Sequence, residues 1–170
     1  IGTIIGALFG GIPADRWGRR PVLKGVASLY LLTSICVAIA NSWAFFLVFR
    51  MLGGIAVGAS SVIAPLYTAE ISPAARRGKL VATVQLNIVI GIVVSYLSNY
   101  VIVKMMPIEV GWRWMLGIQA IPSFIFLAVC YFIPESPRWL HQRGKEKESL
   151  TVMKDLWGNE EAAEVLANMQ

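Results

Sequence analysis

The sequence predicts an all-α protein, a polytopic bundle of helices that cross a membrane. Hydrophobic residues make up 56% of its 170 residues and charged residues only 15%, and its mean hydropathy is +0.64. Soluble domains carry about 25% charged residues. The charges collect at short junctions between long apolar runs. Because a helix needs about 20 largely apolar residues to cross a bilayer, these runs are candidate spans.

Five such runs predict a membrane bundle over residues 1–135. The first run, 1–14, is short, which is typical of a helix whose beginning is missing. The sequence also begins at Ile1, without Met or a charged leader, so we expect a fragment of a longer chain. The remaining expected spans are 22–40, 43–69, 80–103 and 114–133.

The distribution of Lys and Arg predicts the orientation of the spans. Of the 15 such residues, twelve lie at three basic junctions and in the C-terminal segment, two lie at the opposite ends of the spans, and Arg50 lies within one. Since cytoplasmic loops are enriched in Lys and Arg, we place these junctions in the cytoplasm of a multi-pass protein of a bacterial inner membrane or plasma membrane. Nucleic-acid binding is disfavoured because the basic residues form no single soluble face.

Residues 136–170 predict amphipathic cytoplasmic helices. Ser136 and Pro137 are typical of a helix start and Gly144 of a stop. Apolar residues then recur at helical spacing as far as Trp157. Asn159 is a candidate cap for one more short helix.

Arg50 is the charged residue placed deepest in an expected span. It lies about 10 Å beyond Trp43 at a rise of about 1.5 Å per residue. Such a charge usually faces a partner or a wet cavity, although a long Arg side chain can also reach the surface. Because no carboxylate of this sequence lies at similar depth, we expect its partner on a helix outside the sequence.

Polar residues also interrupt the run 80–103. One face of the expected helix carries Gln85, Ile92, Tyr96 and Asn99. The amide of Gln85 has the donors and acceptors that suit a hydroxyl-rich ligand. A hydrogen bond between two helices would use the same groups, and the residues alone leave both interpretations open.

Acidic residues accompany the basic ones at every junction. Asp and Glu contribute little to orientation, so their presence indicates ion pairs between helix ends. One interpretation is a network that closes the inner face and breaks when that face opens; the other is a set of solvated pairs worth little. The sets are Asp15 with Arg16, Arg19 and Arg20; Glu70 with Arg76 and Arg77; and Glu135 with Arg138.

Five motifs occur in order along the chain: Gly10–Arg20; Arg50–Gly58 with Pro65–Glu70 and Arg77–Gly78; Gln85–Ile88 with Gly91; Gly111–Trp114; and Pro134–Leu140. Together they resemble the sugar porter family of the major facilitator superfamily, and within it the bacterial xylose–proton symporter type. The resemblance covers essentially the whole chain. It implies the N-terminal half of a twelve-helix fold, from the second helix to the sixth, and the start of the cytoplasmic helical domain.

The resemblance also implies roles for particular residues. Gln85, with Ile88 and Ile92 beside it, belongs to the sugar-binding wall, and Ile92 is apolar where the xylose symporter type has an amide, so xylose is not implied. Arg50 pairs with an acid of the first helix at the proton-coupling site. The inner charge network contains Asp15, Arg19, Arg20, Glu70, Arg77, Glu135 and Arg138.

The expected function is therefore transport of a monosaccharide by alternating access, coupled to H+. The expected partners are the sugar, H+, the lipid bilayer, and the first helix and C-terminal bundle of the same protein. We expect no cofactor and no metal, and no phosphate-binding loop for ATP occurs in the sequence. Cys36 and Cys130 lie within apolar runs and predict no disulfide.

Three alternatives differ in class. A facilitative carrier or a carrier for another solute would share the fold, although a phosphate or organic-ion carrier would need a charge near the depth of Gln85. A transporter-like sugar sensor would carry long cytoplasmic extensions. A membrane enzyme is disfavoured because His141, the only histidine, has no nucleophile or metal-ligand set around it.

Overall fold

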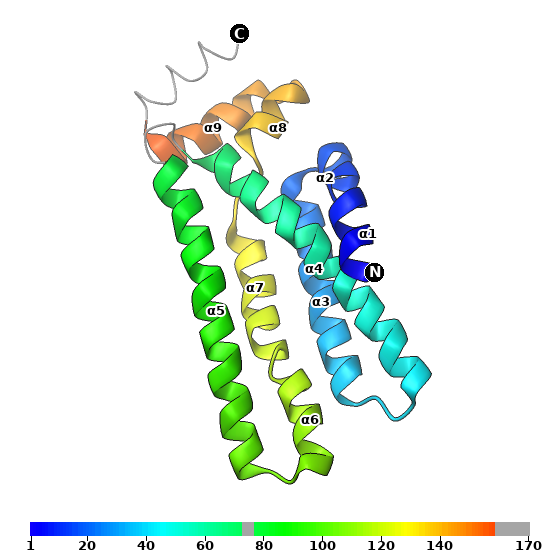
Figure 1. Ribbon diagram of the computed structural model, residues 1–170. Coiled ribbons are helices and arrows are strands. Elements are labelled where there is room, and N and C mark those ends of the chain that lie inside the picture. Colours follow the sequence, from blue (N-terminus) through cyan, green and yellow to red (C-terminus); the bar gives the residue numbers. More distant parts are fainter. Residues whose placement is uncertain (73–76, 159–170) are drawn as a thin grey trace.

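The structure, a computed structural model, describes residues 1–72 and 77–158, apart from the side chains of Arg77, Val81 and Ile108. Over these ranges the regular structure is entirely helical, which confirms the all-α prediction (Figure 1). The helix expected from Asn159 lies outside the described residues. The helices are α1 (Gly2–Phe9), α2 (Gly11–Trp17), α3 (Arg19–Ala38), α4 (Trp43–Ile71), α5 (Arg77–Met105), α6 (Ile108–Gly117), α7 (Ala120–Phe132), α8 (Pro137–Gln142) and α9 (Glu146–Trp157).

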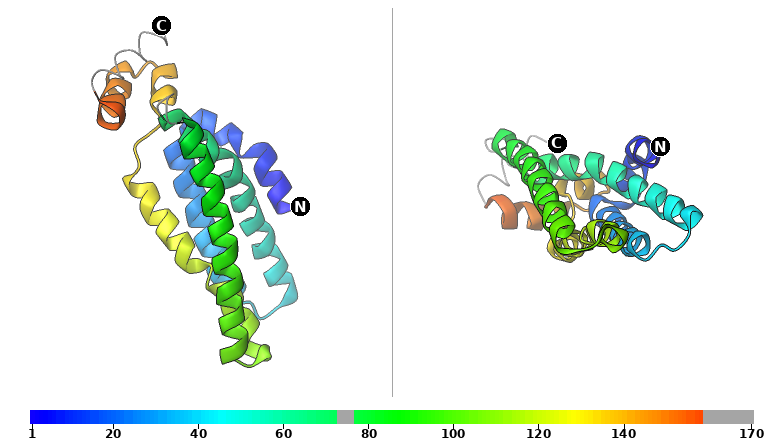
Figure 2. Two further views of the ribbon diagram at one scale, coloured as in Figure 1. Left: turned by 60° about the vertical axis from the view of Figure 1, so that its left-hand side comes forward. Right: turned by 60° about the horizontal axis from the view of Figure 1, so that its bottom comes forward.

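Four segments are long and apolar enough to cross a membrane: Arg19–Ala38, Trp43–Ile71, Gly78–Met105 and Glu109–Phe132. The long helices run roughly side by side, and the two short helices α8 and α9 lie across one end (Figures 1 and 2). We call this end, where α2 meets α3 and α7 leads into α8, the basic end. At the opposite end short connections join α3 to α4 and α5 to α6.

Prolines divide two of the expected spans into shorter helices. The first run is split at Gly10, because Pro13 lacks the N–H that would bond the carbonyl of Phe9. The last span is split at Ile118 and Gln119, because Pro122 cannot donate to the carbonyl of Ile118. That carbonyl instead accepts the N–H of Ile121 at 3.1 Å, so the chain tightens by one residue at this break.

Glycines let α1 lie directly against the backbone of α4. A Cβ placed on Gly6 would collide with the carbonyl oxygen of Ile55, and one placed on Gly58 would collide with the carbonyl oxygen of Thr3. Small residues allow this close approach in membrane helices. Glycines recur every four residues in both segments, at positions 2, 6 and 10 and at positions 54 and 58. This spacing places them on the faces where α1 and α4 pack closely.

A small apolar core joins α2, α3, α4 and α7. Ala14, Leu23, Ile63 and Cys130 are buried together, and none of the four is more than 2% exposed. Cys130 is thus buried as a small apolar residue, whereas Cys36 is only partly buried. Most other apolar side chains of the long helices point outward, as membrane-spanning helices require.

The glycine contact predicts an unusual response to alanine. In an ordinary helix Gly→Ala is stabilising by up to about 1 kcal/mol, but Gly58→Ala would push α1 away from α4 and cost about 1–3 kcal/mol, as overpacking does. Thermal unfolding of the full-length protein in detergent measures this. Gly25→Ala in α3 is the matched control, since nothing lies within 4 Å of an added Cβ there, and equal effects of the two changes would contradict the packing argument.

Candidate functional site

At the basic end, the side chain of Arg19 ties α2, α3 and α4 together. Its Nε and Nη2 donate to the two carboxylate oxygens of Glu70 at 3.0 and 2.9 Å, so the pair is bidentate. Its Nη1 donates to the carbonyl of Ala14 at 3.1 Å, and Asp15 lies 3.0 Å from Nη2. The side chains of Arg19 and Glu70 are 7% and 6% exposed, whereas that of Asp15 is 70% exposed.

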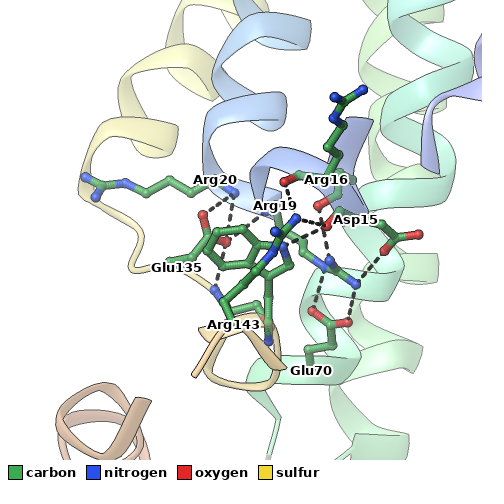
Figure 3. Close-up of polar contacts among 10 residues, drawn as sticks. Asp15, Arg16, Arg19, Arg20, Glu70, Glu135 and Arg143 are labelled. Carbon is green, nitrogen blue, oxygen red and sulfur yellow. Dashed lines mark hydrogen bonds and ion pairs between the residues drawn. The ribbon is translucent and has the colours of Figure 1, made fainter. Parts of the chain in front are cut away.

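The carboxylate of Glu135 caps the start of α3 from the other end of the chain. Its Oε1 accepts the backbone N–H groups of Arg19 at 2.9 Å, Arg20 at 3.1 Å and Ser136 at 2.9 Å (Figure 3). The residue before α3, Gly18, has φ +105, and a Cβ there would meet the Glu135 carboxylate. A glycine is needed at this position both for its backbone conformation and for the approach of the acid.

Helices α8 and α9 are held through carbonyl groups at the C-terminal ends of α2 and α4. The indole of Trp139 donates to the carbonyl of Asp15 at 3.0 Å, and Arg143 donates to that of Arg16 at 2.6 Å. From α9, Trp157 donates to the carbonyl of Ile71, at the end of α4, at 2.8 Å. Helix C-terminal carbonyls lack partners within their own helix, so α8 and α9 satisfy them.

The expected charge network is therefore only partly assembled in the described residues. Asp15, Arg19, Glu70 and Glu135 lie together, and Arg20 contacts Glu135 through its backbone N–H rather than its guanidinium. Arg138 is exposed, and within residues 1–72 and 77–158 its side chain has no hydrogen bond or ion pair. The side chain of Arg77 lies outside the described residues.

Arg50 lines a cavity of about 580 Å³ between α1, α3 and α4. Within the described part of the chain, its guanidinium makes no hydrogen bond or ion pair, and no other lining side chain is charged. Polar groups of Thr3, Tyr30 and Thr33 share the wall. The cavity thus combines one cation with neutral hydroxyl groups.

Gln119, which no motif in the sequence singles out, also lines this cavity. Its side-chain oxygen accepts the hydroxyl of Tyr30 at 3.4 Å. Gln119 reaches the cavity from the break between α6 and α7, and discontinuous spans are where transporters commonly build their sites. Pro122, three residues later, was the signal that could have drawn attention to it.

The expected sugar-binding residues lie elsewhere. Gln85, Ile88 and Ile92 are on α5 and are exposed, the two isoleucines each by 51%. None of the three lines the Arg50 cavity. No described side chain of α5 is buried, so its faces are open to whatever surrounds this part of the protein.

Apolar helices joined at one end by a buried ion pair, with an exposed cation lining a cavity between three of them, are typical of multi-pass membrane proteins of the transporter class. The profile of the family described as "Sugar (and other) transporter" matches residues 1–170, and the chain belongs to this family. The resemblance inferred from the motifs is thereby confirmed.

Individual relatives agree with this assignment. The chain is 39% identical over 170 residues to the glucose transporter GlcP of Staphylococcus epidermidis, covering 100% of this chain and 37% of GlcP. It is 34% identical over 192 residues to the D-xylose-proton symporter of Escherichia coli K12, covering 100% of this chain and 39% of the symporter.

A solved structure gives the same picture of the fold. The xylose transporter XylE from E. coli, in a partially occluded inward-open conformation, superposes with a TM-score of 0.91 at 34% identity, over 98% of this chain and 44% of that one. This match confirms the major facilitator fold. The chain spans well under half the length of each of these relatives.

The cap on α3 predicts that Glu135 matters more than an ordinary surface acid. Glu135→Ala would leave backbone N–H groups of Arg19 and Arg20 without their charged acceptor, which costs at least about 2 kcal/mol. Thermal unfolding of the full-length protein reports the loss. The matched control is Glu148→Ala, which removes an exposed carboxylate paired with Lys145 and costs under about 1 kcal/mol; similar losses in the two variants would refute the capping role.

Proposed function

We propose that the full-length protein moves a monosaccharide across the cell membrane by alternating access and couples this movement to a proton. The family is one of transporters rather than enzymes. Two relatives bear names that specify sugars, glucose in one and xylose with a proton in the other. The observation that carries the coupling is the guanidinium of Arg50, which lies in a cavity without a carboxylate partner among the described residues.

A charge within a membrane span is costly unless something compensates it. We propose that the acid of the first helix, outside this chain, pairs with Arg50 across the cavity. Protonation of that acid would release the guanidinium, and deprotonation would restore the pair. The proton would thereby bias the equilibrium between two arrangements of the bundle, which is what coupling requires.

The sugar would be bound by α5 together with the C-terminal bundle of the same protein. Gln85 supplies an amide that both donates and accepts hydrogen bonds, and Ile88 and Ile92 supply apolar contacts on the same helix. All three are exposed here, which is consistent with a wall shared with a second bundle. Transporters of this architecture bind substrate near the midplane between two repeats.

The ion cluster would close the cytoplasmic side. Its buried members, Arg19 and Glu70, hold one bundle together, so the contacts that break on opening would be made by the exposed ones. Asp15, which pairs with Arg19 at the edge of the cluster, and Arg138 are exposed members of the proposed network and would contact a second bundle. We place Arg77 in the same network from the sequence.

Uptake by the full-length protein in proteoliposomes tests the proposal. A panel of pentoses and hexoses is offered with and without an imposed proton gradient. The proposal requires that at least one sugar be concentrated only when the gradient is present. If a sugar only equilibrates across the membrane, at a rate independent of the proton gradient, the protein is a facilitative carrier. If no sugar is transported, a sensor or a carrier for another solute is favoured.

Replacing Arg50 separates coupling from movement. Arg50→Leu should abolish accumulation against a gradient, because the acid then has no charge partner to respond to its proton, while sugar exchange persists. Counterflow and gradient-driven uptake measure the two. The control Lys104→Leu removes a cation near the same end of the bundle and should retain accumulation; full accumulation by Arg50→Leu would eliminate the charge-pair mechanism.

Replacing Gln85 tests the sugar wall. Gln85→Ala removes about one hydrogen bond, worth about 1 kcal/mol, so the sugar should bind roughly fivefold to tenfold more weakly. Equilibrium binding to the full-length protein measures the change. Asn87→Ala is the matched control, since it removes an amide from another face of α5. An unchanged affinity in Gln85→Ala would take this residue out of the binding site.

A further inference from the structure

The side chains of two basic residues at the basic end take no part in the ion pairs among the described residues. Arg20 and Lys24 lie four residues apart on α3, a spacing that places both side chains on one face of a helix. Both reach Tyr131 of α7: Arg20 Nη2 donates to its carbonyl oxygen at 2.8 Å, and Lys24 Nζ lies 4.4 Å from the centre of its ring. The three residues form a small basic and aromatic site between α3 and α7.

Neither cation is neutralised within the described residues. The ion pairs there join Arg19 to Asp15 and to Glu70, and Lys145 to Glu148. The nearby Glu135 accepts only the backbone N–H of Arg20, whose side chain runs away from that carboxylate toward α7 (Figure 3). The Nε of Arg20 is buried without a hydrogen-bond partner, and of its two terminal nitrogens only Nη2 donates within the described residues. Nη1 therefore keeps its donors for another acceptor.

The surroundings of the site are apolar and exposed. Tyr131 is 59% exposed, its neighbour Phe132 is 88% exposed, and Val129, two residues before Tyr131, is 51% exposed. The site therefore lies where an apolar helix surface ends and the basic end begins. In a membrane this is the depth of the lipid headgroups, next to the acyl chains.

We propose that Arg20, Lys24 and Tyr131 bind the headgroup phosphate of an anionic phospholipid. An Arg offers paired N–H donors to phosphate oxygens, and a Lys adds a point charge beside them. The ring of Tyr131 positions Lys24 through a cation–π contact, and the acyl chains lie along the exposed side chains of α7. Basic pockets between spans are known to hold such headgroups. The proposal rests on the membrane-spanning fold of this family. If the basic end faces the cytoplasm, as the distribution of Lys and Arg predicts, the lipid belongs to the inner leaflet.

Native mass spectrometry of the full-length protein in detergent tests this site. Phosphatidylglycerol is the probe, and phosphatidylethanolamine with the same acyl chains is the zwitterionic reference. Because each basic residue near an anionic headgroup contributes about 1 kcal/mol, the double variant Arg20→Gln/Lys24→Gln should bind phosphatidylglycerol roughly tenfold to thirtyfold more weakly. Its binding of phosphatidylethanolamine should stay the same.

The matched control is Lys147→Gln/Lys154→Gln, which removes two exposed cations of α9 at the same end of the bundle. It should retain phosphatidylglycerol binding, and an equal loss in the control would show general charge attraction and overturn the site. Undiminished binding by the α3 variant, or equal binding of both lipids by the unmodified protein, would also overturn it.

A single substitution guards against misfolding of the double variant. Lys24→Gln leaves the bond from Arg20 to the Tyr131 carbonyl in place and should weaken phosphatidylglycerol binding about fivefold. No change in this variant would contradict the proposal even if the double variant could not be purified.

Discussion

The basic end of this bundle depends on one buried guanidinium. Burying an ion costs several kcal/mol, and only a complete set of partners offsets that cost. Arg19 has such a set: a bidentate bond to Glu70 of α4, the carbonyl of Ala14 in α2, and Asp15 at the exposed edge. Because these partners come from different helices, α2, α3 and α4 can satisfy the charge in only one arrangement. Glu135 adds a fourth tie, since it caps α3 from the connection between α7 and α8.

The close contact at the glycines sets the relative position of α1 and α4. Where α1 lies against α4 backbone to backbone, neither helix can shift without opening a gap or causing a collision. The Arg50 cavity opens between these helices and α3, and Gly2 and Gly54 of the close contact form part of its wall. A charge held in a preformed cavity can respond to its partner without first reorganising the protein, which suits a coupling site.

Much of this could be predicted from the sequence, and the failures have physical causes. Hydropathy and charge placement indicated the membrane helices, because lipid leaves few other ways to satisfy a backbone. The acids and bases at the junctions indicated a cluster, but not that Glu135 would accept backbone N–H groups instead of pairing with Arg138. Side-chain pairing can be read from residue types, whereas a bond to the backbone depends on where a helix begins. The position of Gln119 could not be predicted for a similar reason, because it depends on where α6 ends and α7 begins. The break caused by Pro122 places Gln119 beside the cavity.

Arg20 takes part in both the helix cap formed by Glu135 and the proposed lipid site. Its backbone N–H belongs to the cap that Glu135 forms on α3, while its guanidinium bonds the carbonyl of Tyr131 on the exposed side of α7. An anion bound to that guanidinium would hold α3 against α7 and would act on the first turn of α3, next to Arg19. Suppose that the ion cluster rearranges when the inner face opens. Lipid binding would then be coupled to opening through the first turn of α3, which carries both Arg19 and Arg20. A lipid that binds one arrangement of the bundle more tightly than the other favours that arrangement. Its effect on the equilibrium between the two arrangements cannot exceed the difference between its two binding free energies.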